Sequence, residues 1–282
     1  MRLGLRLTGK VVCIIMIATG IVAQSRHSSR YGDMEGTIVN VVAKRTDDKK
    51  DPIRLENIDL YENALEQKIK NFSFDPSPSR IVLLVDNSKT VGADIEKLKS
   101  AVMEFAYEIF EGDQLFVIAY DEKAEIIQGN PYLFDALDVT TREILMPLMP
   151  GTRKTAIVVI GDGLDRGSKT EFDKILGELQ NRDVTVYGLQ LRVRTGGAYR
   201  RNQPKAGVVM TRLVEGTGGQ LFPLDEAQTA AKAICDELRN NRSLLSYLPV
   251  NTSSYDNRVV FVAADEGISV RTKKAQPPNI KQ

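Results

Sequence analysis

The chain has 282 residues, of which 42% are hydrophobic and 27% charged, so it is long enough for one large globular domain with appended segments. Its 38 Lys and Arg residues nearly balance 37 Asp and Glu residues, and no basic stripe is interleaved with aromatic residues, so we expect no nucleic-acid partner. The single histidine, His27, lies in a polar N-terminal segment, which removes the usual Ser/His and Cys/His catalytic pairs and any His-based zinc site. We therefore expect a protein that is not an enzyme.

The first 23 residues have the three-part layout of a secretory signal peptide. Three basic residues fall within the first ten positions, the apolar run Val11–Ala18 follows, and small residues lead up to Ala23. An uncleaved membrane anchor is the alternative, but the apolar run is shorter than the roughly 20 residues that span a bilayer. The sequence therefore predicts export to the periplasm, cell envelope or medium, with no membrane span after cleavage.

The two cysteines do not predict a disulfide in the mature chain. Cys13 lies in the signal segment, and Cys235 lies in a helical pattern. We expect Cys235 to be a small buried apolar residue.

Residues 24–79 are expected to form a tail, a small β unit and a linker. Gln24–Asp33 is polar, whereas Thr37–Ala43 and Ile58–Asn63 have the composition of strands. The linker is Asp75–Ser79, in which two prolines disfavour both helix and central strand.

A candidate binding site follows the apolar run Ile81–Val85, which predicts a buried strand. The strand is followed by Asp86, Ser88 and Thr90, which place three oxygen-bearing side chains at alternate positions. Ligands of α/β sheets bind beyond the carboxyl ends of the strands, and Mg²⁺ and Ca²⁺ prefer such oxygen ligands. The alternative is that Ser88 or Thr90 simply caps the next helix.

Strand and helix patterns then alternate, which predicts parallel strands joined by right-handed crossovers. The expected strands are Gln114–Tyr120, a short partner Ala124–Gln128, Thr155–Ile160, Val184–Leu191 and Gly219–Pro223. The expected helices are Gly92–Phe110, one within Leu133–Met149, one that begins near Ser168 and contains Phe172–Leu179, Gly207–Gly216 and Asp225–Asn240. Three further strands are expected in Leu244–Val250, Arg258–Ala263 and Ile268–Thr272, pairing with the N-terminal strands into one satellite β unit.

Two separate segments resemble a von Willebrand factor type A (VWFA) domain. Asp86-x-Ser88-x-Thr90 and the later Thr155–Gly163 (TAIVVIGDG) are similar to the parts of its metal-ion-dependent adhesion site, which has Asp-x-Ser-x-Ser, then a Thr, then an Asp after a later strand. Thr90 keeps the hydroxyl of the second Ser, and Asp162 matches the late Asp. Thr217–Phe222 is also similar to the short sequence motif Thr-Gly-Gly-x-x-Phe, which precedes the last helix of exported bacterial A domains. The resemblance spans Arg80 to about Arg239 and implies a doubly wound, mostly parallel α/β fold.

The resemblance also implies a divalent cation, Mg²⁺ or a similar ion, held by Asp86, Ser88, Thr90 and Asp162. A carboxylate from a protein partner would complete its coordination. The family's middle Thr aligns with Pro131, within Gly129–Ala136, and proline has no side-chain oxygen. A hydrated Mg²⁺ keeps several waters and tolerates one missing ligand with weaker binding. A metal-free structural scaffold is the alternative.

Residues Gly163–Thr170 offer a remote enzymatic alternative, because they follow a strand and precede a helix like a phosphate-binding loop. The Gly required before Lys-Thr is replaced by Ser168, and Asp162 and Asp165 bring negative charge. We expect instead that Ser168 caps the next helix, with Glu171 completing a capping box.

The sequence thus predicts a signal peptide (1–23), an N-terminal tail, β unit and linker (24–79), a VWFA-like domain (80–240) and a C-terminal β extension (241–282). The predicted function is binding or adhesion to a protein partner that presents an acidic residue.

Overall fold

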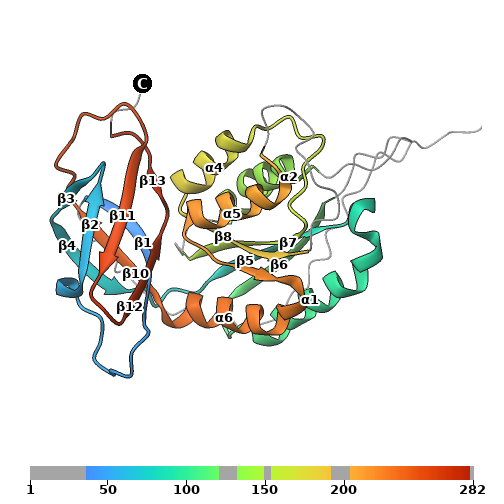
Figure 1. The fold of residues 1–282 in the computed structure, drawn as a ribbon, viewed down its shortest axis with the longest axis horizontal. Coiled ribbons are helices and arrows are strands. Elements are labelled where there is room, and N and C mark those ends of the chain that lie inside the picture. Colours follow the sequence, from blue (N-terminus) through green and yellow to red (C-terminus); the bar gives the residue numbers. More distant parts are fainter. Residues whose placement is uncertain (1–35, 121–131, 149–153, 192–203, 280–282) are drawn as a thin grey trace, which may run out of the picture.

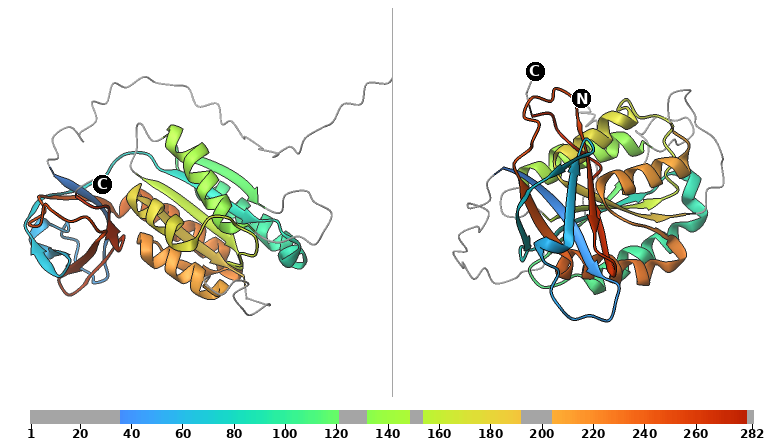
Figure 2. Two further views of the ribbon diagram at one scale, coloured as in Figure 1. Left: turned by 90° about the horizontal axis from the view of Figure 1, so that it is seen from above. Right: turned by 60° about the vertical axis from the view of Figure 1, so that its left-hand side comes forward.

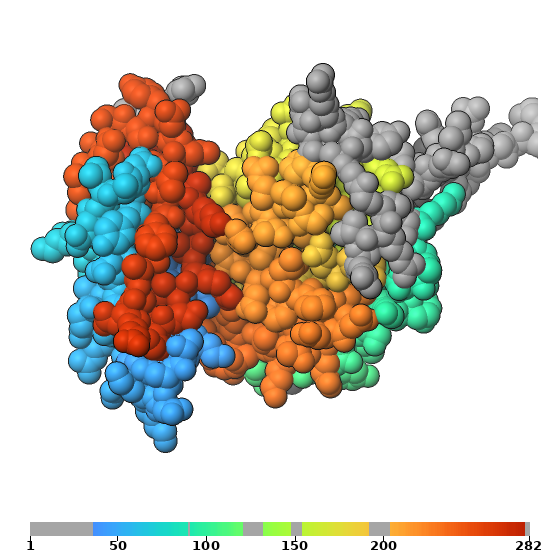
Figure 3. All heavy atoms as spheres, in the orientation of Figure 1, coloured from blue at the N-terminus to red at the C-terminus, as the bar shows by residue number. Residues whose placement is uncertain are grey.

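The computed structural model describes residues 36–120, 132–148, 154–191 and 204–279. This part of the chain forms an α/β unit and a β-sandwich that lie side by side and in contact (Figures 1 and 3). Among these residues, no helix is long and apolar enough to cross a membrane. The predicted signal peptide, the short strand Ala124–Gln128 and Pro131 all lie outside the described residues.

The α/β unit is built on a parallel sheet whose described strands have the order β6-β5-β7-β8-β9. The strands are β5 (Arg80–Asp86), β6 (Gln114–Tyr120), β7 (Thr155–Gly161), β8 (Val184–Gln190) and β9 (Leu221–Pro223). The apolar runs predicted to be buried strands occupy the centre of this sheet, and every residue of β7 is buried. Strand β6 lies at the edge of the described sheet, and its Gln114, Val117 and Ala119 are exposed.

Helices cover both faces of this sheet, as the alternating pattern predicts (Figures 1 and 2). On one face, α1 (Ile95–Glu108) and α6 (Ala227–Asn240) pack against Ile81, Leu83 and their neighbours. On the other, α2 (Leu133–Val139), α4 (Phe172–Asn181) and α5 (Ala206–Thr217) pack against Val82, Leu84 and their neighbours. The fold is therefore the expected doubly wound α/β arrangement.

Several helix boundaries differ from expectation. A 3₁₀ turn, η3 (Lys89–Asp94), precedes α1, so the regular helix begins at Ile95 rather than at Gly92. Helix α2 continues as a π-helical segment, η4 (Thr140–Leu145), into α3 (Met146–Leu148), and a second 3₁₀ turn, η5 (Leu224–Glu226), precedes α6. Cys235 is buried in α6 as predicted, and burial raises the pKa of its thiol to about 12.

The satellite β unit is a sandwich of two antiparallel sheets rather than a small β layer. The first has the order β12-β1-β10-β4, from β1 (Thr37–Arg45), β4 (Ile69–Phe74), β10 (Arg242–Tyr247) and β12 (Ile268–Thr272). The second has the order β13-β11-β2-β3, from β2 (Ile58–Glu62), β3 (Leu65–Gln67), β11 (Arg258–Ala264) and β13 (Ala275–Gln276). A 3₁₀ turn, η2 (Leu55–Asn57), leads into β2. Both sheets contribute to one core, which includes Val41, Leu60, Leu245 and Val260.

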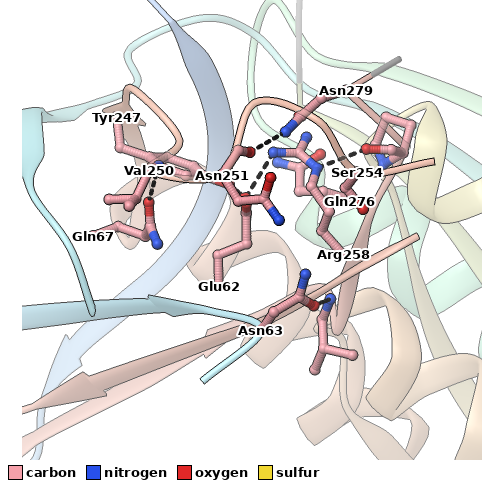
Figure 4. A network of polar contacts seen from close by, with 12 residues as sticks. Glu62, Asn63, Gln67, Tyr247, Val250, Asn251, Ser254, Arg258, Gln276 and Asn279 are labelled. Carbon is pink, nitrogen blue, oxygen red and sulfur yellow. Dashed lines mark hydrogen bonds and ion pairs between the residues drawn. The ribbon is translucent and has the colours of Figure 1, made fainter. Parts of the chain in front are cut away.

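A buried polar network lies at one end of this sandwich (Figure 4). The Glu62 carboxylate accepts a hydrogen bond from the Tyr247 hydroxyl and one from Arg258 Nη1 at 2.7 Å, and all three side chains are buried. Arg258 Nε also donates to the Pro277 carbonyl at 2.8 Å, which joins the C-terminal segment to the same network. Breaking such a buried ion pair by removing one partner is strongly destabilising, so this end of the sandwich is held by charge as well as by packing.

The sandwich packs against the end of the parallel sheet at which the strands begin. Buried Arg242 donates to Thr185 Oγ1 at the start of β8, at 2.8 Å. Buried Lys273 donates to the Gln180 carbonyl at 2.7 Å and forms an ion pair with Asp183 at 2.6 Å, on the turn that enters β8. The opposite end of the sheet, formed by the carboxyl ends of the parallel strands, therefore faces away from the sandwich.

Candidate functional site

Strand order brings two of the predicted ligands together. Strands β5 and β7 are parallel neighbours with Val85 opposite Ile160, so Asp86 ends β5 beside Gly161, which is followed by Asp162. A methyl group at Gly161 would lie 2.8 Å from Asp86 Cβ and 3.3 Å from Asp86 Oδ2, so only a glycine allows this approach. Asp86 and Asp162 are both buried at the carboxyl edge of the sheet.

Both carboxylates have one oxygen held by their own turn. Asp86 Oδ1 accepts the backbone N–H of Ser88 at 2.8 Å, and Asp162 Oδ1 accepts that of Leu164 at 2.8 Å. These are Asx turns, which fix each carboxylate relative to the backbone two residues on. The second Asp86 oxygen, Oδ2, is buried, and within the described part of the chain it has no hydrogen-bond partner. The Asp86 carboxylate therefore has an acceptor oxygen available for another group.

Ser88 is buried and lies beside Asp86, and its side chain as well as its backbone hydrogen-bonds to the Asp86 carboxylate. Ser88 occupies the N-cap position of the turn Lys89–Asp94, but its side chain makes no capping hydrogen bond. Thr90 follows within this turn, and its side chain lies outside the described part of the structure. Of the four predicted ligands, Asp86, Ser88 and Asp162 are thus described together at one place.

Tyr120, a residue that the sequence did not indicate, completes the buried surroundings of Asp86. It ends β6 opposite Asp86, is 6% exposed, and its hydroxyl would lie 3.4 Å from a methyl group at Gly161. The position at the end of the neighbouring apolar strand was the one available signal. Burial raises the pKa of Tyr120 well above its usual value, and the nearby Asp86, Asp162 and Asp165 raise it further.

The electrostatics of the site favour a positive charge. The pKa of Asp86 is raised to about 6: burial and the negative charge of Asp162 raise it, and the hydrogen bonds from Ser88 and the nearby Tyr120 hydroxyl partly oppose them. Burial also raises the pKa of Asp162, and the Leu164 N–H bond and the positive charge of Arg166 oppose this rise only in part. Holding both carboxylates ionised in this buried place costs free energy unless a cation neutralises them. Within the described ranges, no group of three or more His, Cys, Asp or Glu side chains is placed to share one ion, so hydroxyl groups and water would have to supply the other ligands.

The loop Gly163–Thr170 is tied to the start of α2 rather than to a helix of its own. Asp165 Oδ1 accepts from Phe134 N at 3.1 Å and from Ser168 Oγ at 2.5 Å, and Ser168 Oγ accepts from Asp135 N at 3.0 Å. The prediction that Ser168 caps the next helix is wrong: α4 begins at Phe172, and its N-cap residue, Glu171, makes no side-chain cap. The Ser168 hydroxyl is instead held by Asp165 and the α2 backbone.

In the same loop, a carboxylate occupies the backbone amides that a phosphate-binding loop would offer. Asp135 accepts from Lys169 N at 3.0 Å and from Thr170 N at 2.9 Å. Burial alone would raise the pKa of Asp135, but these hydrogen bonds from Thr170 and Lys169 lower it from its usual value. The Asp135 side chain therefore lies where a phosphate of the remote alternative would have to bind.

Comparison with known proteins finds no matching family model and no significant match among curated protein sequences. Among solved structures, the chain is similar to proximal thread matrix protein 1 from the mussel byssus, at 13% identity and a TM-score of 0.43. That match covers 60% of this chain and 49% of the mussel chain, so it spans about half the length of that protein. A second similarity, to the human COPII-coat protein Sec24c, has 10% identity and a TM-score of 0.28, and covers 72% of this chain and 44% of that one.

Proposed function

We propose that this chain is an exported VWFA-type binding protein that recognises a protein partner through a divalent cation at the carboxyl edge of its parallel sheet. Asp86, Ser88 and Asp162 would hold the ion, with Thr90 as the further hydroxyl ligand that the family pattern implies. An acidic residue of the partner would complete the coordination. When bound, the ion supplies a positive charge that attracts this carboxylate.

One observation carries this proposal: Asp86 Oδ2 is buried next to a second buried carboxylate and has no hydrogen-bond partner among the described side chains. Buried polar atoms nearly always have a partner, and an unsatisfied carboxylate oxygen is especially costly. A cation fits this place, because oxygen ligands from Asp86, Ser88 and Asp162 suit Mg²⁺, and water can provide the remainder of its coordination.

The test is a calorimetric titration of the purified chain with Mg²⁺ and Mn²⁺. We expect a saturable heat from the parent chain and none from Asp86→Ala, while Asp59→Ala, at an exposed position of the sandwich, behaves like the parent. The absence of heat from the folded parent chain would contradict the proposal.

A metal-free scaffold is the second candidate, and a specific observation favours it. The Asx turns of Asp86 and Asp162 are complete without any ion, since each carboxylate already accepts a backbone N–H. The two functions differ in partner capture from a cell-envelope extract: an ion-dependent binding protein loses its partner in chelator and regains it with Mg²⁺, whereas a scaffold keeps it throughout.

A further inference from the structure

The sandwich has an apolar sheet face that no described element covers. We call it the outer face: it belongs to the sheet β13-β11-β2-β3 and is centred on Tyr61, Val259 and Phe261. Val259 and Phe261 are each 61% exposed, and Tyr61 is half-buried. None of the described helices lies over strands β2 and β11 (Figure 1).

The composition of β11 is that of a strand buried on both sides. Val260 and Val262 point into the sandwich core, and the alternate positions, which should be polar on a solvent-facing antiparallel sheet, are Val259 and Phe261. Phe261 is directly opposite Tyr61 on β2, and the two ring centroids lie 6.2 Å apart. The apolar side chains thus form one continuous cross-strand group rather than scattered exposed residues.

The backbone under this group is fixed. The Asn63 side chain accepts the Val259 N–H at 2.8 Å, and Asn63 N donates to the Val259 carbonyl at 2.8 Å (Figure 4). Below it, the Glu62–Arg258 ion pair anchors the start of β11 in the core. The outer face is therefore a preorganised surface, which lowers the ordering cost of binding.

The charges around the outer face specify what kind of partner fits. Asp59 lies opposite Ala263, Glu66 lies opposite Tyr61, and both acidic side chains are exposed. Within the bounds of these four strands, no outward position carries a basic side chain; one exposed lysine, Lys68, directly follows β3. A second copy of the chain would bring the same acidic residues toward each other, whereas Lys or Arg side chains would pair with them and can also stack on exposed aromatic rings.

We propose that the outer face binds a protein segment with an apolar centre flanked by Lys or Arg residues. The apolar centre covers Val259, Phe261 and Tyr61, and the basic residues meet Asp59 and Glu66. This surface is separate from the cation site, because the sandwich packs where the parallel strands begin and the cation site lies where they end. The molecule then has two binding surfaces on different units and bridges two partners.

The probe is a fluorescently labelled synthetic peptide in which Lys alternates with Phe and Val. Its binding to the full mature chain is measured by fluorescence anisotropy. A chelator is present, so that the cation site takes no part. A Glu-for-Lys peptide and a Ser-for-Phe/Val peptide serve as probe controls. We expect only the Lys-Phe/Val peptide to bind, and the double substitution Val259→Thr with Phe261→Thr to weaken it at least tenfold. Tyr107→Ser, which removes an aromatic side chain that is 75% exposed on α1, should change nothing.

The charge component is tested separately with Asp59→Asn combined with Glu66→Gln, which leaves the apolar centre intact. We expect severalfold weaker binding and a smaller dependence of the affinity on salt. Circular dichroism and thermal unfolding confirm that each variant is folded. Three results would overturn the proposal: no binding of the Lys-Phe/Val peptide, equal binding by the Glu peptide, or a dimer in sedimentation that the Val259/Phe261 double variant dissolves.

Discussion

Replacing the Asp86 carboxylate with an amide should stabilise the folded chain at neutral pH when no divalent ion is present. In the folded state, burial raises the pKa of Asp86 from its ordinary value of 3.8 to about 6. Each pK unit corresponds to about 1.4 kcal/mol, so keeping Asp86 ionised at pH 7.5 costs up to about 3 kcal/mol. The amide side chain that Asp86→Asn introduces carries no such cost and can still accept the Ser88 N–H, although a neutral acceptor bonds more weakly. We expect a net gain of about 1 to 3 kcal/mol in the unfolding free energy.

The pH dependence gives this prediction its sign. A carboxyl pKa raised by folding means that the folded chain binds the proton more tightly than the unfolded chain. The contribution of Asp86 is therefore most favourable below pH 4, falls between pH 4 and about 6, and stays low above that range. Asp86→Asn should flatten this fall in part, since the raised pKa of Asp162 acts in the same direction.

The assay is urea unfolding followed by circular dichroism at pH 4.5, 6 and 7.5, in chelator and in Mg²⁺. At a hundred times its dissociation constant, Mg²⁺ should stabilise the parent by about 2.7 kcal/mol and leave Asp86→Asn unchanged. Asp59→Asn, an exposed replacement on the sandwich, is the matched control and should follow the parent. The reasoning is refuted if Asp86→Asn is less stable than the parent at pH 7.5 in chelator while the parent shows no loss of stability between pH 4.5 and 6.

Three further substitutions test other parts of the structure. Lys273→Ala should lower the unfolding free energy by about 2 to 4 kcal/mol, because it removes a buried ion pair between the sandwich and the α/β unit. Lys274→Ala removes a neighbouring exposed pair and should lower it by less than about 1 kcal/mol; equal losses in urea unfolding would contradict the burial argument. Gly161→Ala should lower the unfolding free energy by about 1 to 3 kcal/mol, since its methyl group would lie 2.8 Å from Asp86 Cβ. It should also weaken Mn²⁺ binding in calorimetry, and unchanged Mn²⁺ affinity would show that this close approach does not shape the site. Ala64 has a φ of 63° in the two-residue β2–β3 turn, a left-handed conformation that costs alanine more than glycine. Ala64→Gly should therefore stabilise the fold by about 0.5 to 1 kcal/mol and raise the midpoint of thermal unfolding, and a lower midpoint would contradict this.

The α/β fold could be predicted from the sequence because its central strands are uninterrupted apolar runs separated by amphipathic helices. Ile81–Val85 and Thr155–Ile160 have the pattern of buried strands and are buried in the structure. The extent of the sandwich was underestimated for a physical reason. Strand β4 (IKNFSF) is polar and lies at a sheet edge, and β13 has two residues, so neither produces a clear periodic signal.

The candidate site was predictable in part for the same reason. Parallel strands end at one edge, so side chains that follow two neighbouring strands, such as Asp86 and Asp162, must come close together. No such rule predicts which residues a loop brings into contact. The Asp165–Ser168 bond depends on how the loop after β7 folds back onto α2, and the sequence instead suggested a helix cap at Ser168. Tyr120 was missed because an aromatic residue at a strand end is usually part of the core.

The most direct test of the proposed site is a crystal structure of the chain grown with Mn²⁺, with diffraction data collected at the manganese absorption edge. The account predicts an anomalous peak within bonding distance of Asp86 Oδ2, with Asp162 and the Ser88 hydroxyl bound directly or through water. Well-ordered density at this edge with no peak there, or a peak elsewhere on the chain, would contradict it.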